Sequence, residues 1–178
     1  DRKYILVNGA EGSYLLSRQA PSKVLQQLHT DVYGAKILFH SPYLYLCTKR
    51  GLTVLPYNRL ATAANLSGIS PRFTNAGEPD PLLSIAQAPD SSIWVATGNK
   101  LYRIADTSRV RQQQFGALSL REFIFTKHAL VGYTFDNKLV IAHRYNSPSV
   151  QLDYVPENDA VWNKFYPLND SIVILSAN

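Results

Sequence analysis

The sequence of 178 residues contains a single cysteine, Cys47, and no methionine. One cysteine excludes an internal disulfide bond and a thiolate metal cluster, because each needs at least two sulfur atoms from the chain. Long apolar runs are also absent, since no stretch approaches the roughly eighteen apolar residues of a membrane helix. The sequence starts at Asp1 without a signal-peptide pattern. We therefore expect a segment of a longer protein, with membrane contact only through segments outside it.

Charged residues are scarce as well, at 17% of the chain against a usual share of about 25%. Hydrophobic residues make up 46%, which is enough to form a folded core and excludes a disordered chain. Eighteen Lys and Arg residues against thirteen Asp and Glu residues leave a net charge of +5. The sequence has no dense run of Lys and Arg of the kind that binds phosphates, so we predict no nucleic-acid partner.

The patterns that mark catalytic and cofactor sites are missing too. The four histidines, His29, His40, His128 and His143, do not show the spacing of a zinc site. The sequence has no nucleophile elbow, no phosphate-binding loop and no dinucleotide-binding glycine motif. We therefore predict a protein that is not an enzyme and has no metal site, no cofactor and no catalytic residue.

What the sequence does contain is a repeat. Its unit is an apolar run, a polar turn and a second apolar run, which is typical of a β-hairpin. A small polar residue ends the first run of each copy, and successive marker residues lie 37 to 49 positions apart. The repeat length of a four-stranded propeller blade is about 40–45 residues. The copies are residues 4–16, 43–55, 92–104, 129–141 and, in half, 172–176, with the markers Asn8, Thr48, Thr97, Thr134 and Ser176.

A further strand is expected on each side of these hairpins. A short apolar run precedes the hairpin, as at 83–86, and a more polar run follows it, as at 109–115. We expect the first strand to be the most apolar because it lies nearest the packed centre, and the polar fourth strand to form an exposed edge. Residues 22–33 and 58–68 show near-helical spacing. We interpret both as blade edge plus connection, with a short helix as the alternative.

These patterns predict an all-β fold of propeller blades, with four antiparallel strands in each of about four blades. The number of expected strands is not a multiple of four, which favours part of a larger propeller or array over a four-bladed ring with one surplus strand. We treat residues 1–178 as one domain. Its repeats are expected at about 1–34, 35–81, 82–118, 119–158 and 159–178.

Residues 86–104 resemble the propeller repeat of two-component regulators, whose pattern runs roughly D-G-x-I/L-W-x-x-T-x-x-G-L-Y-R. Ser91-Ser92 replaces the usual turn Gly, and Lys100 stands where Gly normally precedes Leu-Tyr. The resemblance implies a non-catalytic, ligand-sensing or signal-input module of a bacterial regulator, such as a hybrid histidine kinase. It also implies a periplasmic or other extracytoplasmic location, a small-molecule ligand such as an oligosaccharide, and a homodimer formed through the parent protein.

Trp94 and Thr97, the two most characteristic residues of that segment, are predicted to be structural. A Trp buries a large apolar area between stacked sheets, and a Thr hydroxyl at a strand end satisfies turn amides. We also expect the basic residues between positions 99 and 128 to form one solvated blade edge, with an acidic-partner site as the alternative. These residues are Lys100, Arg103, Arg109, Arg111, Arg121 and Lys127.

The predicted binding face comes from the propeller topology. The loops from second to third strand, and from fourth strand to the next blade, meet on one face, where donors, acceptors and an aromatic ring would suit sugar hydroxyls. The alternative is a protein–protein interaction scaffold, although the sequence lacks the Trp-Asp dipeptide and Gly-His pair of WD repeats at its repeat ends. The predicted ligand-binding residues are His29, Asp31, Tyr33, Lys49, Arg50, Asp80, Asn99, Arg121, Asp136 and Asn137.

Overall fold

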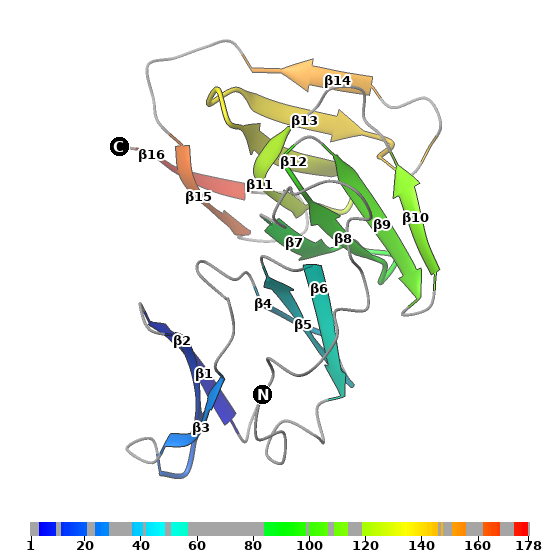
Figure 1. Cartoon of the computed structure of the whole chain (residues 1–178). Coiled ribbons are helices and arrows are strands. Elements are labelled where there is room, and N and C mark those ends of the chain that lie inside the picture. The colour runs from blue at the N-terminus through cyan, green and yellow to red at the C-terminus, as the bar shows by residue number, and fades with distance from the viewer. Residues whose placement is uncertain are drawn as a thin grey trace. The chain divides into compact units, whose positions relative to one another are not determined.

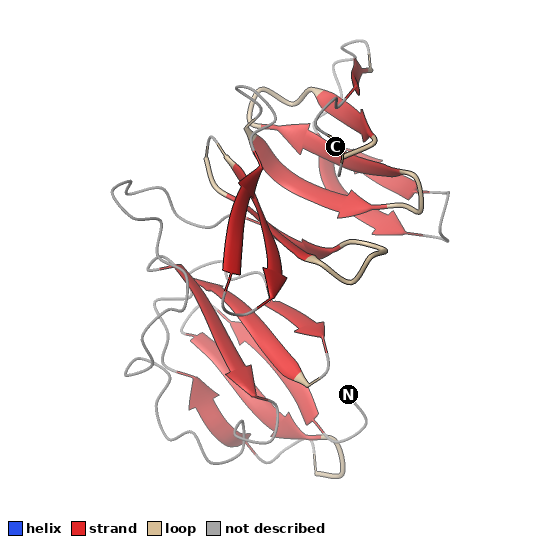
Figure 2. Cartoon of the chain, turned by 90° about the vertical axis from the view of Figure 1, so that its right-hand side faces the viewer, coloured by secondary structure: helices blue, strands red, loops and turns tan. Residues whose placement is uncertain are grey.

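The fold was analysed in a computed structural model, in which every regular element of the described residues is a β-strand (Figures 1 and 2). There are sixteen such strands, β1 to β16, and no helix within the described residues. All strand pairs are antiparallel, and within each sheet the paired strands are consecutive in sequence. The structure describes residues 4–9, 12–20, 24–28, 37–40, 42–48, 51–56, 84–98, 100–106, 109–113, 119–145, 147, 151–155, 162–167 and 173–177.

The chain divides into two compact units, Asp1–Pro81 and Leu82–Asn178. The first unit contains two three-stranded sheets, with the orders β1-β2-β3 and β4-β5-β6. The hairpins predicted at 4–16 and 43–55 are confirmed by the β1–β2 and β5–β6 pairs. The strands are β1 Tyr4–Gly9, β2 Gly12–Ser17, β3 Val24–Leu28, β4 Ile37–His40, β5 Tyr43–Thr48 and β6 Gly51–Pro56.

The second unit contains two four-stranded sheets and a two-stranded one, and each four-stranded sheet is a simple meander. This matches the predicted blade, in which a hairpin is flanked by one earlier and one later strand. The first sheet is made of β7 Ser84–Gln87, β8 Ile93–Ala96, β9 Leu101–Asp106 and β10 Arg109–Gln113. The others are β11 Leu120–Phe125, β12 Ala129–Thr134, β13 Leu139–His143 and β14 Gln151–Tyr154, and then β15 Trp162–Pro167 with β16 Val173–Ala177.

The near-helical spacing at 22–33 does not produce a helix where the structure describes this segment. Residues 24–28 form β3, which pairs with β2 so that Gln27 lies opposite Tyr14. The interpretation of this stretch as a blade edge is therefore confirmed, because strand pairing decides the backbone conformation over local spacing. The second such stretch, 58–68, lies outside the described residues, as does the segment expected to hold the fourth strand of the second blade.

Both faces of the β11–β14 sheet are buried, as face-to-face stacking of blades requires. Leu130 and Val140 belong to an apolar cluster that includes Trp94 and Leu101 of the preceding sheet. Tyr133 packs on the other face, in a second cluster with residues of the two-stranded sheet. Successive side chains of a strand point to opposite faces, so one strand serves both clusters.

Burial differs between the first and the second strand of each four-stranded sheet. All four residues of β8 are buried, whereas buried and half-buried residues alternate along β7. Likewise, β12 is more buried than β11. The second strand is more buried because it is flanked by a strand on each side, whereas the first forms one edge of its sheet. The polar fourth strand is confirmed for β14, whose residues are mostly exposed.

Candidate functional site

The candidate site is built on the turn between β12 and β13, which is held by the hydroxyl group of Thr134. This oxygen accepts a hydrogen bond from the backbone nitrogen of Lys138 at 3.0 Å and contacts the carboxylate of Asp136. The backbone nitrogen of Asn137 donates to the carbonyl oxygen of Thr134 at 3.1 Å. Asn137 has a φ of 61°, a left-handed conformation that Asn tolerates better than most residues. The turn therefore has a fixed shape.

Phe135 stands exposed at the tip of this turn. Half of its surface, 50%, is open to solvent, although a Phe side chain gains free energy by leaving water. Beside it, the ammonium nitrogen of Lys138 lies 3.0 Å from a carboxylate oxygen of Asp136. Hydrogen bonds from Thr134 and Lys138 hold the pKa of Asp136 below its ordinary value. Asp136 is thus a carboxylate that accepts hydrogen bonds at neutral pH.

Arg121 reaches the same turn because β11 carries a β-bulge. Leu120 pairs with Thr134 and Glu122 pairs with Tyr133, so Arg121 is the extra residue opposite the end of β12. Its guanidinium carbon lies 6.0 Å from the centroid of the Tyr133 ring, at the outer limit of a cation–π contact. Arg121 is exposed. In the part of the chain that the structure describes, no carboxylate forms an ion pair with it.

Tyr133 ties the bulge to the sheet. Its hydroxyl group donates a hydrogen bond to a carboxylate oxygen of Glu122 at 3.1 Å. Burial, the negative charge of Glu122 and this hydrogen bond together raise the pKa of Tyr133 to about 12. The phenol therefore stays neutral at physiological pH and acts as a fixed support beneath Arg121.

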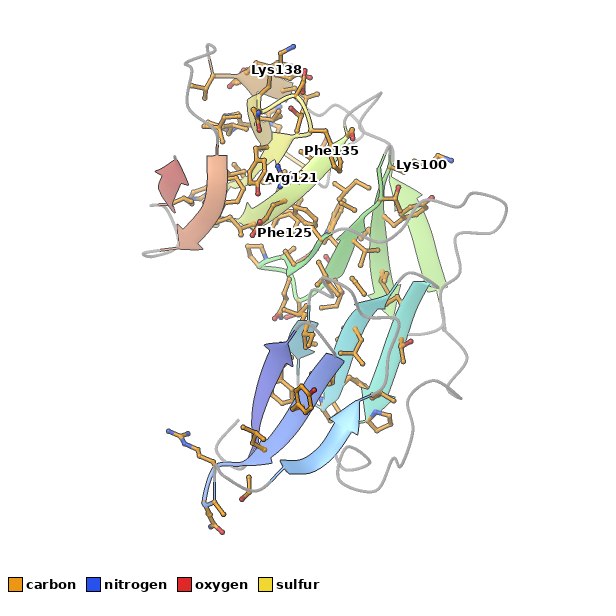
Figure 3. All side chains as sticks on the ribbon, turned by 60° about the vertical axis from the view of Figure 1, so that its left-hand side comes forward. Lys100, Arg121, Phe125, Phe135 and Lys138 are labelled. Atoms are coloured by element: carbon orange, nitrogen blue, oxygen red, sulfur yellow. The ribbon has the colours of Figure 1, made fainter. Side chains whose placement is uncertain are left out.

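Figure 3 shows Arg121, Phe135 and Lys138 gathered at one end of the β11–β14 sheet, with Lys100 on a turn of the neighbouring sheet. Lys100 belongs to the β8–β9 turn, where its backbone nitrogen donates to the hydroxyl oxygen of Thr97 at 3.1 Å. The hydroxyl group of Ser119, just before β11, contacts the carbonyl oxygen of Gly98 in that turn. We call Arg121 and residues 135–138 the turn face.

Three predicted site residues are described, and the structure brings them together. Arg121, Asp136 and Asn137 all lie on the turn face. The most exposed aromatic ring of that face, Phe135, was missed by sequence reasoning; the available signal was a Phe directly after the marker Thr134 in an otherwise polar turn. The other predicted residues, His29, Asp31, Tyr33, Lys49, Arg50, Asp80 and Asn99, lie outside the described residues.

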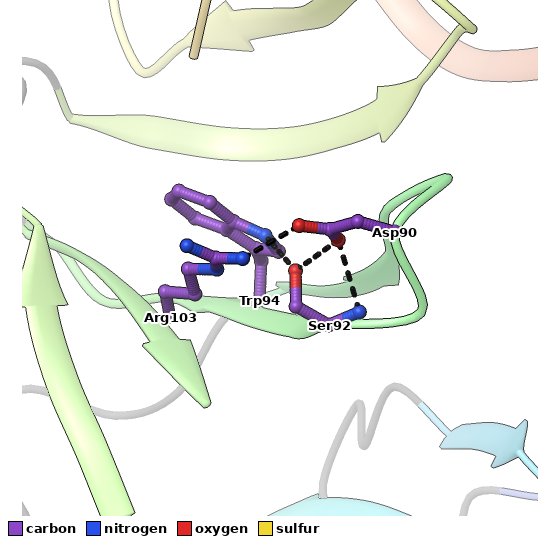
Figure 4. A network of polar contacts seen from close by, with 4 residues as sticks. All are labelled: Asp90, Ser92, Trp94 and Arg103. Carbon is purple, nitrogen blue, oxygen red and sulfur yellow. Dashed lines mark hydrogen bonds and ion pairs between the residues drawn. The ribbon is translucent and has the colours of Figure 1, made fainter. Parts of the chain in front are cut away.

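At the end of the β7–β10 sheet opposite the β8–β9 turn, a polar network provides a hydrogen-bond partner for the indole nitrogen of Trp94 (Figure 4). The indole nitrogen of Trp94 donates to the hydroxyl oxygen of Ser92 at 2.9 Å. That hydroxyl group donates to Asp90 at 2.5 Å, and Arg103 lies 2.6 Å from the other carboxylate oxygen of Asp90. Burial raises the pKa of Asp90, but the bonds from Ser92 and Arg103 outweigh it and hold the pKa below its ordinary value.

The structural roles predicted for Trp94 and Thr97 are confirmed by these contacts. Trp94 is fully buried, and its ring centroid lies 5.7 Å from that of Phe125 and 5.8 Å from that of Tyr145 in the next sheet. The expected single basic edge is not found. Lys100 and Arg121 lie at one end of the sheets, whereas Arg103 contacts Asp90 at the other end.

The described residues contain neither a cluster of metal-ligating side chains nor a membrane-spanning helix. No group of three His, Cys, Asp or Glu residues in the described ranges is placed to hold a metal ion. Within the same ranges, no helix is long and apolar enough to cross a membrane.

Comparison with known proteins identifies the fold. No protein-family model matches the sequence, and no curated protein matches it. Solved structures do match, and three are named here. The β-propeller domain of Cps50 (Swd1) from Myceliophteria thermophila is 9% identical with a TM-score of 0.57, over 82% of this chain and 51% of that chain. An extracellular domain from B. thetaiotaomicron, described as part of a one-component system, is 15% identical with a TM-score of 0.60, over 88% and 21%.

The third structure is the complex of KlAtg21 with the coiled coil of AgAtg16, which is 13% identical with a TM-score of 0.61, over 99% of this chain and 61% of that chain. The chain thus spans about half the length of the first structure and about a fifth of the second. At these identities the likeness establishes the architecture alone. The chain has an all-β, β-propeller fold built of antiparallel blades.

Proposed function

We propose that this chain is a ligand-sensing, signal-input propeller module of a bacterial regulator, that it lies outside the cytoplasm, and that it is not an enzyme. The turn face binds the ligand, a small polar solute of the oligosaccharide class. The observation that carries the proposal is that the turn face holds the exposed Phe135 ring and the exposed Arg121, with which no carboxylate of the described residues forms an ion pair. The likeness to a bacterial extracellular domain supports the location and the sensing role.

The chemistry of the turn face suits a sugar. A pyranose ring has an apolar face of C–H groups that packs on an aromatic ring, and a rim of hydroxyl groups that needs donors and acceptors. Phe135 supplies the ring, Arg121 the donors, and Asp136 an ionised acceptor. A side-chain amide at Asn137 adds to this set. The fixed turn reduces the ordering cost of binding, because its backbone is already held by Thr134.

The same groups argue against catalysis. A general acid at neutral pH needs a raised carboxyl pKa, whereas the pKa of Asp136 is lowered. Glu122 is engaged by the hydroxyl group of Tyr133. In the proposed role the propeller binds its ligand unchanged, and the parent protein, acting as a homodimer, passes the signal on.

The test is a binding screen with a panel of neutral and acidic oligosaccharides, followed by thermal shift and isothermal calorimetry. We expect at least one oligosaccharide to stabilise the protein. Phe135→Ala should weaken that binding about tenfold or more, since one aromatic platform of this kind contributes roughly 1–3 kcal/mol. The matched control is Tyr154→Ala, which removes an equally exposed ring, 54% open, from the edge strand β14. Equal losses in both variants, or no binding by any sugar, would refute the proposal.

A protein-docking scaffold is the second candidate. The observation in its favour is β14, the edge strand of its sheet, where Gln151, Asp153 and Tyr154 are exposed. An exposed edge strand offers unpaired backbone groups to another chain. In that case Tyr154→Ala, and not Phe135→Ala, would weaken capture of a partner, so the same two variants separate the candidates.

A further inference from the structure

A second group of exposed basic residues lies at the end of the β11–β14 sheet opposite the turn face. Lys127 and His128 form the tip of the β11–β12 turn, and Arg144 begins the turn after β13. All three residues are exposed. Ala129 pairs with His143, so His128 and Arg144, the next residues outward on the two strands, are neighbours. We call Lys127, His128 and Arg144 the basic end.

These cations differ from several others in the same unit because no carboxylate neutralises them. Arg103 pairs with Asp90 at 2.6 Å, Lys138 with Asp136 at 3.0 Å, and His143 with Asp153 at 3.2 Å. Within the described residues, no carboxylate lies at ion-pair distance from Lys127, His128 or Arg144. Two carboxylates of the same unit are already engaged, since Asp153 contacts His143 and Asp90 contacts Arg103. Among the described residues, the basic end therefore carries positive charge that no carboxylate balances.

The backbone beneath these side chains is fixed. The hydroxyl oxygen of Thr126 accepts hydrogen bonds from the backbone nitrogens of Ala129 at 3.0 Å and of His128 at 3.4 Å. On the other turn, the backbone nitrogen of Ser147 donates to the carbonyl oxygen of Arg144 at 2.8 Å. Binding here would order only side chains, which lowers its entropic cost.

Arg144 itself is held in a rare conformation. Its φ is 54°, a left-handed value that is strained for an Arg residue. The next residue maintains it, because the Tyr145 side chain is buried and its ring centroid lies 4.7 Å from that of Phe125. The left-handed backbone thus belongs to an exposed Arg residue that directly precedes a buried aromatic residue, Tyr145. If this position only had to form the turn, a Gly or Asn residue would adopt the same φ with less strain than Arg144.

We infer that the basic end is a docking surface for an acidic segment of a partner protein, one rich in Asp and Glu side chains. Charge complementarity carries the choice of partner, because Lys127 and Arg144 are exposed cations without a carboxylate partner among the described residues and match two carboxylates on one short segment, with the exposed His128 as a further hydrogen-bonding group. Nucleic acid is disfavoured because a duplex or long strand needs a wider field of phosphate contacts. This surface is separate from the turn face, so it does not depend on the proposed sugar binding.

The test uses a fluorescein-labelled peptide of ten glutamates and the full chain, with fluorescence anisotropy at low and physiological salt. We expect weak binding that falls as salt is added, as surface charge contacts do. The double variant Lys127→Gln and Arg144→Gln keeps long polar side chains and should lower the affinity about tenfold. The control, Arg109→Gln with Arg111→Gln on β10, makes the same change in net charge elsewhere and should have less than about a twofold effect.

Thermal unfolding of each variant shows that it is folded before its affinity is compared. Equal losses in the two double variants would mean that only net charge matters, and would overturn the inference. Failure of the peptide to bind the wild-type chain would overturn it too. A DNA oligonucleotide of equal charge is the third arm, and tighter binding of the DNA through the same residues would assign the surface to phosphates instead.

Discussion

The indole nitrogen of Trp94 lies 2.9 Å from the hydroxyl oxygen of Ser92 and donates a hydrogen bond to it in a buried position. Ser92 is the only link between this donor and the carboxylate of Asp90 within the described network. The Ser92 hydroxyl group thus accepts a hydrogen bond from the buried indole ring and donates one to Asp90, which forms an ion pair with Arg103. The blade depends on a residue that the repeat pattern leaves unspecified.

Ser92→Ala should therefore destabilise the chain by about 1–3 kcal/mol, because it removes the hydroxyl oxygen that accepts the hydrogen bond of the buried Trp94 donor. Chemical denaturation measures the change. Trp94→Phe removes the donor itself, so Ser92→Ala should cost clearly less in that background. Additive losses in the double variant would show that the hydrogen bond contributes nothing to stability.

Ser91→Gly should stabilise the chain by about 0.5–1 kcal/mol. Ser91 has a φ of 66°, in the turn where the resembled repeat usually has Gly, and a left-handed conformation is strained for a residue with a Cβ atom. The unfolding free energy of the variant checks this. Ser91→Ala keeps the Cβ atom and should bring no gain, so a similar gain from both substitutions would contradict the explanation.

Gly132→Ala should destabilise the chain by about 1–3 kcal/mol, because close-packed strands leave no room for a methyl group. An added Cβ atom would lie 2.9 Å from a methyl carbon of Leu120, 3.0 Å from the carbonyl oxygen of Glu122 and 3.1 Å from the Cβ atom of Phe123. The Leu120 side chain can move, but the Glu122 carbonyl is part of the sheet. Combining the variant with Leu120→Ala should not restore stability, and full rescue would show that the clash involves only side chains.

Tyr133 should ionise only near pH 12, well above an ordinary tyrosine. Burial, followed by the Glu122 carboxylate, favours the neutral phenol in the folded state. The pKa is raised on folding, so the stability it contributes is fully present below about pH 10 and is lost as the pH rises through about 12. The difference in phenolate absorbance between the wild type and Tyr133→Phe, followed with pH, isolates this one residue.

Glu122→Gln should lower that pKa toward the ordinary value, because it removes the negative charge that opposes ionisation. Asp136→Asn is the matched control, since it removes a carboxylate from the nearby turn that does not affect Tyr133. An unchanged titration in Glu122→Gln would mean that burial alone sets the pKa.

The amino-acid sequence by itself determined the strand order of each sheet. Apolar runs separated by polar turns encode hairpins locally, because strand alternation and turn chemistry act over a few residues. The β8–β9 and β12–β13 hairpins and their neighbouring strands were therefore predictable. The role of Thr97 was predictable for the same reason, since its hydroxyl group acts on its own turn.

Only the tertiary structure decided which residues meet at the turn face and at the basic end. Arg121 is placed opposite the end of β12 by a bulge that no local pattern predicts, and Phe135 was missed because exposure is a property of the packed sheet. Basic residues that are close in sequence lie at opposite ends of the sheets, because the two ends of one strand are far apart. Residues of different strands meet at the turns at each end. Local sequence sets the strands, and packing between them sets the surfaces that bind.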